Sequence, residues 1–432
     1  MPVAARALDG VSSYGLAFAS FFATQLLGVV AAGGWNDARG PRGPVLGGLG
    51  VFAAGLLVGR ALTGLGGGLL GVSLFVVVAQ VYPKELQPRV FGAISTAWVL
   101  PSIVGPAIAG WLATHWSWRA VFLLVLPLAV LLVPVLARQL APAPPSSATG
   151  PGVTPSPPTA PGVTPSPPTA PGATSDTGGG RVGRRLVRGV GLAAGAVALQ
   201  GGIDAGGPAG IAAAVAGAVL VCVALPGLVP PGTVRLRRGL PSLVAVRGLF
   251  TGTWSGAEAF VPLMLVEHRG VTPALAGAVL TCGSIGWTAG SWLQGARWFR
   301  IQRTSMLTLG AAVLGVGVLL LAGTPLGSVP ALLVAGAWIV AAGGMGLGMS
   351  SMSVLTLWLS PAGEEGRSSS ALQVGDALGS LLGIGLAGAL FSALHTPAVP
   401  DAGAYAVVWL AVGLAGVLAA LVSLRVRRPA AL

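Results

Sequence analysis

Glu258 is one of two acidic residues that lie inside long apolar stretches of this sequence, where a carboxyl group could carry protons. Thr251, Trp254, Ser255 and Pro262 share its face at helical spacing. An ionisable side chain is costly inside hydrocarbon, so such a residue usually marks a cavity or a proton path. We therefore predict that Glu258 faces a cavity and binds and releases a proton there.

Asp376 is the second such residue, and it lies in the apolar stretch 368–394. Ser369, Gln373 and Ser380 share its face at helical spacing. This polar stripe favours the same role, so we interpret Asp376 as a second proton carrier. The alternative for both acids is a neutral carboxyl group that is hydrogen-bonded inside a helical bundle.

Composition places these acids in a membrane. The chain has 432 residues, of which 54% are hydrophobic and 8% charged, against roughly 25% charged residues in a soluble domain. Its apolar stretches each have nearly the length of about 20 residues that a membrane-spanning helix needs. Because a backbone in lipid must satisfy its own hydrogen bonds, we expect an all-α integral membrane protein.

The apolar stretches predict about thirteen helices. We place them at 12–34, 45–62, 65–82, 91–113, 118–138, 187–203, 208–229, 241–266, 271–293, 304–323, 329–356, 368–394 and 403–424. The segment 44–82 is short for two spans. We expect its turn at residues 63–68, whose glycines can adopt positive φ.

The net charge of +13 is distributed over the loops in strict alternation. The basic loops carry Arg39, Arg42; Lys84, Arg89; Arg138, Arg181, Arg184, Arg185, Arg188; Arg235, Arg237, Arg238; Arg297, Arg300, Arg303; Arg367; and Arg425, Arg427, Arg428. By the positive-inside rule these loops and the C-terminus are cytoplasmic. The pattern indicates a multi-pass protein of the cell membrane rather than a protein that binds nucleic acid. The bias toward Arg over Lys, with many Ala, Gly and Pro, favours a bacterial origin.

Neither a metal centre nor an enzyme active site is expected. Cys222 and Cys282 lie in apolar stretches without His or Asp at ligand spacing, so we interpret them as core thiols. No nucleophile and base form a recognisable pair, and no cofactor is implied.

The segment 139–180 interrupts the apolar pattern. It is rich in Pro, Ala, Ser, Thr and Gly and repeats PGVTPSPPTA at 151–160 and 161–170. Such a composition cannot bury apolar area, so we predict a disordered cytoplasmic linker over 139–186. A passive tether is the simplest interpretation, and docking of a partner is the alternative.

The segment 33–42 predicts a charged turn between two helices. Gly33 permits close helix contact, Asp37 can accept hydrogen bonds or face an arginine, and Gly40 with Pro41 reverses the chain before Arg42. A similar pattern of Ala, Gly and Trp recurs at 289–297, where Gln294 replaces the acid. This echo indicates duplicated halves, which are typical of transporters.

Two further motifs lie in predicted helices. Arg60 and Gly64 form an Arg-xxx-Gly pattern, and an arginine near a helix end can snorkel to the membrane surface. The stretch 101–110 contains Pro101, Gly105, Pro106 and Gly110. There a proline kink among small residues can act as a pivot and seal. An ordinary packing kink is the alternative.

Together these motifs resemble those of the major facilitator superfamily. The 33–42 segment is similar to the family's cytoplasmic latch between the two halves, Arg60 to an arginine linked to proton transfer, and 101–110 to the antiporter signature of the fifth helix. The resemblance implies two pseudo-symmetric helical bundles around a central cavity. We expect Trp98, Trp254, Trp287 and Gln373 to line that cavity.

Two extra helices between the halves resemble the fourteen-helix branch of drug–proton antiporters. The expected divisions are an N-terminal bundle at 1–138, the linker at 139–186, two additional helices at 187–229 and a C-terminal six-helix bundle at 230–432. The resemblance implies a monomer in the lipid bilayer that exports small amphipathic or drug-like molecules, with the proton gradient as its energy source. The alternatives are an uptake transporter for a small solute and a truncated, non-transporting membrane protein.

The position of the latch departs from the family pattern. In the family the latch follows the second helix, whereas here it follows the first predicted one. We therefore expect that the opening helix of the N-terminal bundle is missing, through either a misassigned start site or a truncated gene.

Overall fold

The architecture is all-helical in the part of the chain that the structure, a computed structural model, describes. The described residues are 14–83, 85–87, 89–94, 97, 112, 116, 123–139, 178–205, 207–294, 301–326, 329–361, 363–394 and 402–426. They contain no β-strand. The predicted fold class is therefore confirmed for these residues.

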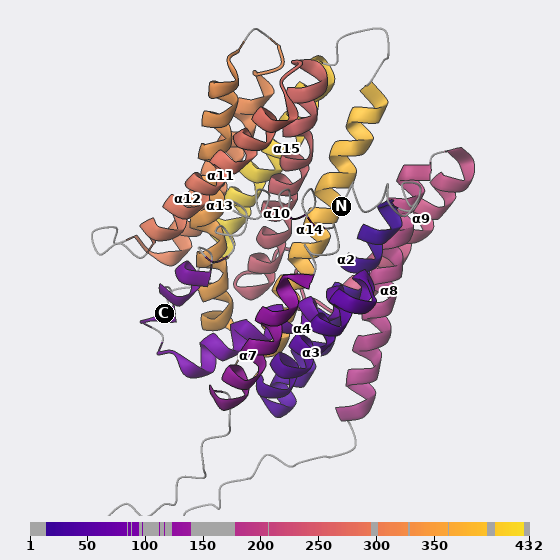
Figure 1. Ribbon diagram of the computed structural model, residues 1–432, viewed down its shortest axis with the longest axis vertical. Helices are drawn as coiled ribbons and strands as arrows, with labels where there is room; N and C mark the ends of the chain where they lie inside the picture. Colours follow the sequence, from indigo (N-terminus) through magenta and orange to yellow (C-terminus); the bar gives the residue numbers. More distant parts are fainter. Residues whose placement is uncertain are drawn as a thin grey trace, which may run out of the picture.

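The first half of the described chain forms two packed groups of helices (Figure 1). The helices are α2 (Tyr14–Arg39), α3 (Arg42–Val58), α4 (Arg60–Val81), α7 (Val125–Gln139), α8 (Gly178–Ala205) and α9 (Gly207–Ala224), with a 3₁₀ turn at Leu225–Gly227. Helices α2, α3 and α4 pack on one another. Helices α8 and α9 form a hairpin whose first helix runs beside α2.

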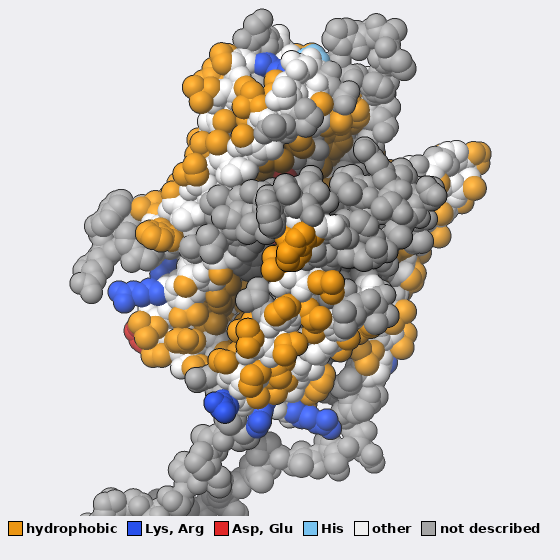
Figure 2. Space-filling view, viewed as in Figure 1, with side chains coloured by type: hydrophobic (Ala, Val, Ile, Leu, Met, Phe, Trp, Pro, Cys, Tyr) orange, Lys and Arg blue, Asp and Glu red, His pale blue; other side chains and the backbone are white. Residues whose placement is uncertain are grey.

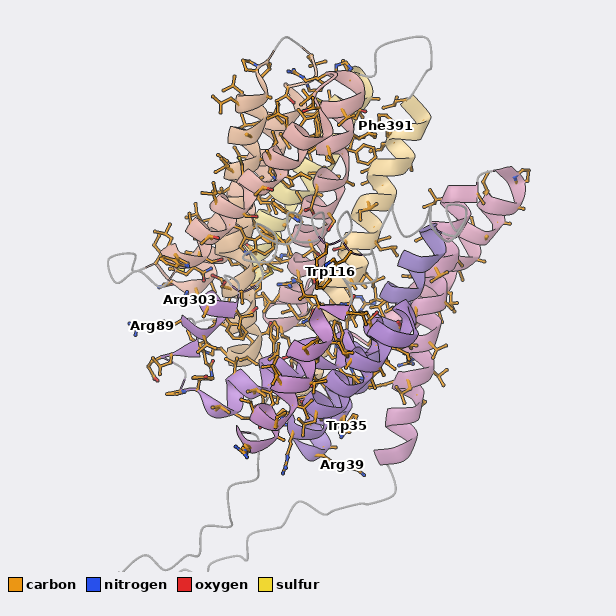
Figure 3. The ribbon with its side chains drawn as sticks, in the orientation of Figure 1. Trp35, Arg39, Arg89, Trp116, Arg303 and Phe391 are labelled. Atoms are coloured by element: carbon orange, nitrogen blue, oxygen red, sulfur yellow. The ribbon has the colours of Figure 1, made fainter. Side chains whose placement is uncertain are left out.

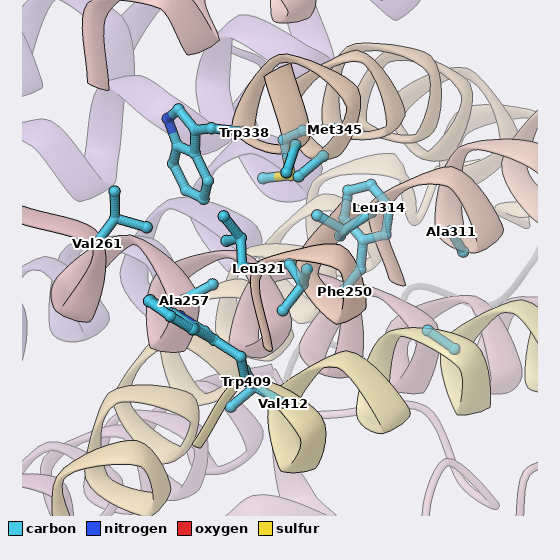
Figure 4. Close-up of a cluster of buried hydrophobic side chains, with 14 of the residues drawn as sticks. Phe250, Ala257, Val261, Ala311, Leu314, Leu321, Trp338, Met345, Trp409 and Val412 are labelled. Atoms are coloured by element: carbon cyan, nitrogen blue, oxygen red, sulfur yellow. The ribbon is translucent and has the colours of Figure 1, made fainter. Parts of the chain in front are cut away.

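The second half forms a larger group of long helices. They are α10 (Leu240–Leu263), extended by a π-helical turn at Met264–His268, then α11 (Pro273–Leu293), α12 (Arg303–Ala322), α13 (Ala331–Leu359), α14 (Glu365–Leu394) and α15 (Ala402–Ser423), which ends in a 3₁₀ turn at Leu424–Val426. Their core contains the fully buried Phe250, Trp338 and Trp409 (Figure 4). Large aromatic side chains thus fill the space between these helices.

A second core cluster joins the two groups across the molecule. It combines Val29 and Val30 of α2 with Leu192 of α8, Val244 of α10 and Val374 of α14. The helices of the two halves are therefore held together by apolar packing around the α2–α14 contact.

The structure corrects the predicted turn at 33–42. Helix α2 continues through Gly33 to Arg39, and the reversal is confined to Gly40, whose φ of +72° favours glycine, and Pro41. Helix α2 contains no proline, and the Asn36 side chain donates to the Ala32 carbonyl one turn earlier. The charged residues of the motif consequently project from a helix.

The predicted turn at 63–68 is also wrong. Helices α3 and α4 meet at Gly59, whose φ is +150°, and residues 63–68 lie inside α4. The glycines there serve packing instead, because a methyl group on Gly66 would collide with the backbone of Phe52, and one on Gly68 with the backbone of Gln25. They bring α4 close to α3 and α2.

Helix α8 starts earlier than expected, at Gly178, so residues 178–186 are helical rather than part of the predicted linker. The rest of the predicted linker, from 140 to 177, lies outside the described residues, as do Trp98 and the motif at 101–110.

The lengths of the helices and the hydrophobic surface both indicate a multi-pass membrane protein. Eight of the described helices are long and apolar enough to cross a bilayer. Figure 2 shows a face that is largely hydrophobic, with Lys and Arg side chains gathered toward its lower part. Trp35 and Arg39 lie at this lower end of the molecule, whereas Phe391 lies near the opposite end (Figure 3).

Candidate functional site

Asp37 connects α2 to α14 at the lower end of the molecule, which we call the latch end. Its Oδ1 accepts a hydrogen bond of 2.6 Å from the Gly366 N–H, and its Oδ2 accepts one of 2.9 Å from the Arg367 N–H. These donors lie in the first turn of α14, where backbone N–H groups lack helical partners and the helix dipole favours an anion. The carboxylate therefore caps a helix from the other half of the chain.

Small residues allow this approach. A methyl group at Gly33 would lie 2.6 Å from Ser370 Cβ, and one at Gly366 would lie 2.6 Å from Asp37 Oδ1. The Ser370 hydroxyl donates a 2.8 Å hydrogen bond to the Val29 carbonyl. Gly33 and Asp37 thus act at one contact, as the sequence pattern suggested.

Neighbouring residues orient the latch from within its own half. Asn36 is buried and donates to Ser73 Oγ of α4 at 3.0 Å. Gly40 donates its N–H to the Asn36 carbonyl and closes the helix, and Arg42 is exposed at the start of α3. The latch residues Gly40 and Arg42 therefore lie at the end of the motif rather than in its contact with α14.

Arg185 of α8 was not singled out from the sequence, yet it lies at the same place. Its half-buried guanidinium interacts electrostatically with Asp37, Glu364 and Arg367. Helix α8 therefore adds a cation to the junction of α2 and α14. Only the basic character of its first turns could have signalled this.

The second copy of the motif makes different contacts. Gln294 is buried, and its Nε2 donates to the Gly346 and Leu347 carbonyls at 2.9 and 2.8 Å. Its Oε1 accepts hydrogen bonds from Arg303 Nη1 and Ser351 Oγ, each at 3.0 Å. These partners belong to α12 and α13, so this copy of the motif braces its own half instead of bridging the two.

Asp376 has a partner that the sequence reading missed. Arg247 of α10 donates from Nε to Asp376 Oδ1 at 2.7 Å, and 5% of the arginine side chain is exposed against 28% of the aspartate side chain. The missed signal was available, because Arg247 is a lone basic residue inside an apolar helix. Asp376 is thus half of a charge pair.

Close packing of α10 and α14 frames this pair. Glycines recur at every fourth position in both helices, at Gly248, Gly252 and Gly256 and at Gly375, Gly379 and Gly383. A methyl group on Gly252 or Gly256 would lie 2.8 Å from the facing carbonyl of α14. Such small-residue stripes let membrane helices touch along their backbones.

Polar bonds run along the same seam. The Thr251 hydroxyl donates to the Arg247 carbonyl at 2.9 Å and approaches the Asp376 carbonyl at 3.2 Å. Ser255 Oγ donates to Ser380 Oγ at 3.0 Å. The predicted companions of the two acids therefore face each other between α10 and α14.

Glu258 has a different environment from Asp376. Its side chain is exposed, and Trp254, one turn earlier on the same helix, is close enough to interact with it. Among the described residues, no Lys, Arg or His forms an ion pair with Glu258. This carboxyl group is therefore open to an external cation or proton.

A cluster of tryptophans adjoins Glu258. Trp254 stacks on Trp338 with ring centroids 4.3 Å apart and meets Trp287 edge-on at 5.5 Å. Trp287 Nε1 is buried and has no hydrogen-bond partner within the described part of the chain. Two of the predicted cavity residues, Trp254 and Trp287, are thus brought together beside the acid.

The remaining candidates lie elsewhere. Gln373 points toward α4, since its Nε2 would lie 3.4 Å from a methyl group on Gly71. Arg60 begins α4, at the end opposite the latch, and its side chain is outside the described part. Pro101, Gly105, Pro106, Gly110 and Trp98 are also outside the described residues. Their roles stay predictions.

Comparison with known proteins agrees with this arrangement. The family model described as Major Facilitator Superfamily matches residues 1–324. The chain belongs to the major facilitator superfamily. This membership groups the chain with membrane transporters rather than with enzymes.

The related proteins include several named as exporters. The multidrug transporter protein MdtP of Bacillus subtilis is 27% identical over 152 residues, covering 32% of this chain and 28% of the relative. The efflux pump ustT of Ustilaginoidea virens is 39% identical over 82 residues, covering 19% of this chain and 15% of the pump. The matched segments thus span less than a third of these relatives.

Solved structures show the same fold over nearly the whole chain. The human organic anion transporter MFSD10 is similar with a TM-score of 0.61 and 15% identity, covering 95% of this chain and 83% of that one. The proton:xylose symporter XylE gives a TM-score of 0.60 at 14% identity, covering 96% and 86%. At such identities the likeness concerns the fold alone.

Proposed function

We propose that this major facilitator exports small amphipathic or drug-like molecules in exchange for protons. The observation that carries the proposal is Glu258, an exposed carboxyl group that forms no ion pair with a described Lys, Arg or His and lies beside stacked tryptophans. An acid of this kind can bind a proton or a polar group of a substrate in turn, and the indole rings offer an apolar surface. Competition between protons and substrate for this one carboxylate would link proton movement to substrate movement.

The similarity to proteins named as efflux pumps and multidrug transporters supports export. The hairpin of α8 and α9 between the two halves supports the fourteen-helix branch. We further propose that the protein works as a monomer in the cell membrane of a bacterium. The latch end and the C-terminus would then face the cytoplasm, following the arginine distribution.

The latch supplies the conformational part of the mechanism. With Asp37 capping α14, the α2–α14 seam is closed at the latch end. Loading from the cytoplasm then requires that these two hydrogen bonds break, so that the halves part at this end. If Glu258 binds protons more tightly with the latch end in one of its two states, closed or open, proton binding would shift the equilibrium toward that state.

A dye-accumulation assay tests the proposal. Expression in an efflux-deficient host is expected to lower ethidium accumulation, and an uncoupler is expected to restore it. Glu258→Gln removes the titrating group at similar size and should abolish the difference, whereas Glu85→Gln, at an exposed glutamate in the loop after α4, should not. Equal accumulation with and without the protein, for ethidium and other amphipathic dyes, would contradict export.

A further inference from the structure

A groove of about 310 Å³ runs between helices α10, α14 and α15 and the segment 225–239, which connects the α8–α9 hairpin to α10 and which we call the connector. It is open along one side, where two leucines of α14, Leu382 and Leu386, are each about half exposed. Val229 of the connector and Val412 of α15 belong to its other walls. The groove therefore lies where the hairpin meets the second half of the chain.

The wall of the groove is almost entirely apolar. Its lining consists of Leu, Val, Ala and Gly with two threonines. The Thr233 hydroxyl donates to the Pro230 carbonyl at 2.7 Å, and the Thr253 hydroxyl donates to the Leu249 carbonyl at 2.9 Å. Neither hydroxyl is left as a free donor, so the groove suits a hydrocarbon chain better than a polar ligand.

The groove is separate from the site around Glu258. It contains Gly248 and Gly252 of α10 but neither Trp254 nor Glu258. Successive residues of an α-helix are about 100° apart around its axis, so Trp254 projects roughly opposite to Gly252. The groove and the tryptophan cluster consequently lie on different sides of α10.

The groove has about the depth of one membrane leaflet. Gly248 of α10 faces Gly375 of α14, and Gly252 faces Gly379, so the two helices run in parallel and both begin at the latch end. From near that end the groove follows α14 from Gly375 to Leu386, about 17 Å at 1.5 Å per residue. Half of a hydrocarbon core of roughly 30 Å is about 15 Å, so an acyl chain of the leaflet at the latch end would match this depth.

Arginines gather where the groove meets the latch end. The connector contains Arg235, Arg237 and Arg238, all exposed, and no acidic residue. A methyl group on Gly232 would collide with Arg237 Cδ, so the stem of this arginine lies against the backbone next to Thr233 in the groove wall. Within the described part of the chain, none of the three arginines forms an ion pair. An anionic group at this position would find guanidinium groups that can bind it.

We propose that the groove binds a phospholipid with an anionic headgroup from the leaflet at the latch end. One acyl chain lies between the connector and helices α10, α14 and α15, and the headgroup phosphate lies on the connector arginines, whose planar guanidinium groups match phosphate oxygens. Basic sites beside membrane helices bind anionic lipids in this way. The bound lipid would hold the hairpin against the second half, and the inference does not depend on the transported substrate or on proton coupling.

Native mass spectrometry of the purified full chain in detergent, titrated with dioleoylphosphatidylglycerol, tests this site. Dioleoylphosphatidylcholine has the same chains without net charge, and dihexanoylphosphatidylglycerol has the same headgroup with short chains. Both should bind more weakly than dioleoylphosphatidylglycerol, because the site needs the charge and the long chain together. Equal affinity for all three lipids would overturn the proposal.

The headgroup part is tested by replacing the three connector arginines by Gln. Affinity for dioleoylphosphatidylglycerol should fall about one hundredfold, since each basic residue near an anionic lipid surface contributes about fivefold. The matched control, Arg39→Gln/Arg89→Gln/Arg138→Gln, removes the same net charge from three exposed arginines elsewhere and should leave the affinity unchanged. An equal loss in both triple variants would show that only net charge matters and would overturn the proposal.

The acyl-chain part is tested by filling the groove. Ala415→Phe, at a half-buried alanine of the α15 wall, should weaken binding roughly tenfold, since each buried methylene that it displaces contributes about fourfold. Ala213→Phe, at an exposed alanine of α9, is the control. Should Ala415→Phe not fold, Leu386→Trp narrows the groove from the α14 wall at a side chain that is 47% exposed. Unchanged affinity in the groove variant, or displacement of the lipid by ethidium, would overturn the proposal.

Discussion

Asp37 Oδ1 lies 2.6 Å from the backbone nitrogen of Gly366, a residue 329 positions later in the chain. A side chain at the end of one helix thus accepts hydrogen bonds from the unpaired backbone N–H groups at the start of another. The contact joins the two halves at the latch end only, since its sequence counterpart Gln294 bonds within its own half. The Ser370–Val29 hydrogen bond adds to the same contact, so Asp37 supplies two of the α2–α14 hydrogen bonds at this end.

Replacing Asp37 by Asn should loosen the latch. The amide has a single acceptor oxygen and no charge for the α14 dipole, and loss of a charged hydrogen bond costs about 1–3 kcal/mol, or roughly a 5- to 150-fold shift in the equilibrium between closed and open latch. Labelling of Ser370→Cys, in a background without Cys222 and Cys282, by an impermeant maleimide should become faster. Glu85→Gln, at an exposed glutamate in the loop after α4, is the control and should not change the rate.

A methyl group at Gly33 should have a related effect for a steric reason. In Gly33→Ala the new carbon would lie 2.6 Å from Ser370 Cβ, so α2 and α14 must separate. Gly34→Ala is an exact chemical match, with no atom within 4 Å of the added methyl group. Dye efflux should fall in the first variant and stay at the wild-type level in the second. Equal efflux in both would contradict the close contact.

The glycine seam predicts a difference in thermal stability. Gly379→Ala forces a methyl group onto the backbone of Gly248, and overpacking of this kind costs about 1–3 kcal/mol. Gly388→Ala lies on the same helix and meets no atom within 4 Å. Unfolding in detergent, followed by tryptophan fluorescence, should show a lower midpoint for Gly379→Ala alone. A lower midpoint for Gly388→Ala as well would contradict a specific role of the seam, because alanine is otherwise the better helix former.

Truncating Trp254 tests the aromatic surface beside Glu258. Trp254→Ala removes the ring that lies beside the acid and stacks on Trp338. We expect weaker dye binding, measured by fluorescence polarisation on the purified protein, by about tenfold for a lost aromatic contact. Trp292→Ala, at a tryptophan that is 67% exposed, is the control. Unchanged binding in Trp254→Ala would place the substrate elsewhere.

Much of the fold could be predicted because the membrane imposes simple rules. Apolar stretches of sufficient length must be helices, and most predicted spans agree with the described helices to within a few residues. The end of α2 could not be predicted from apolarity, since its last turn is polar and is held by Asn36 and the contact with α14. The position of the α3–α4 turn depended on which of many glycines adopts positive φ.

The site was predicted in part. The latch contact followed from residue types in one segment, and Glu258 and Asp376 stood out as acids in apolar stretches. Arg247 was not predicted as part of the site, because its partner Asp376 lies 129 positions away in the chain. The tertiary pairing of α10 with α14 is what distinguishes a paired from an unpaired acid, and single-sequence patterns do not contain it.

The central claim is that Glu258 links proton movement to substrate movement. Proteoliposomes that contain the purified protein and an internal pH indicator provide the direct test. Adding an amphipathic dye at equal pH on both sides should produce a proton flux opposite to the dye flux, and Glu258→Gln should abolish it while Glu85→Gln leaves it intact. Dye movement without any proton flux, or the same flux in Glu258→Gln, would contradict the account.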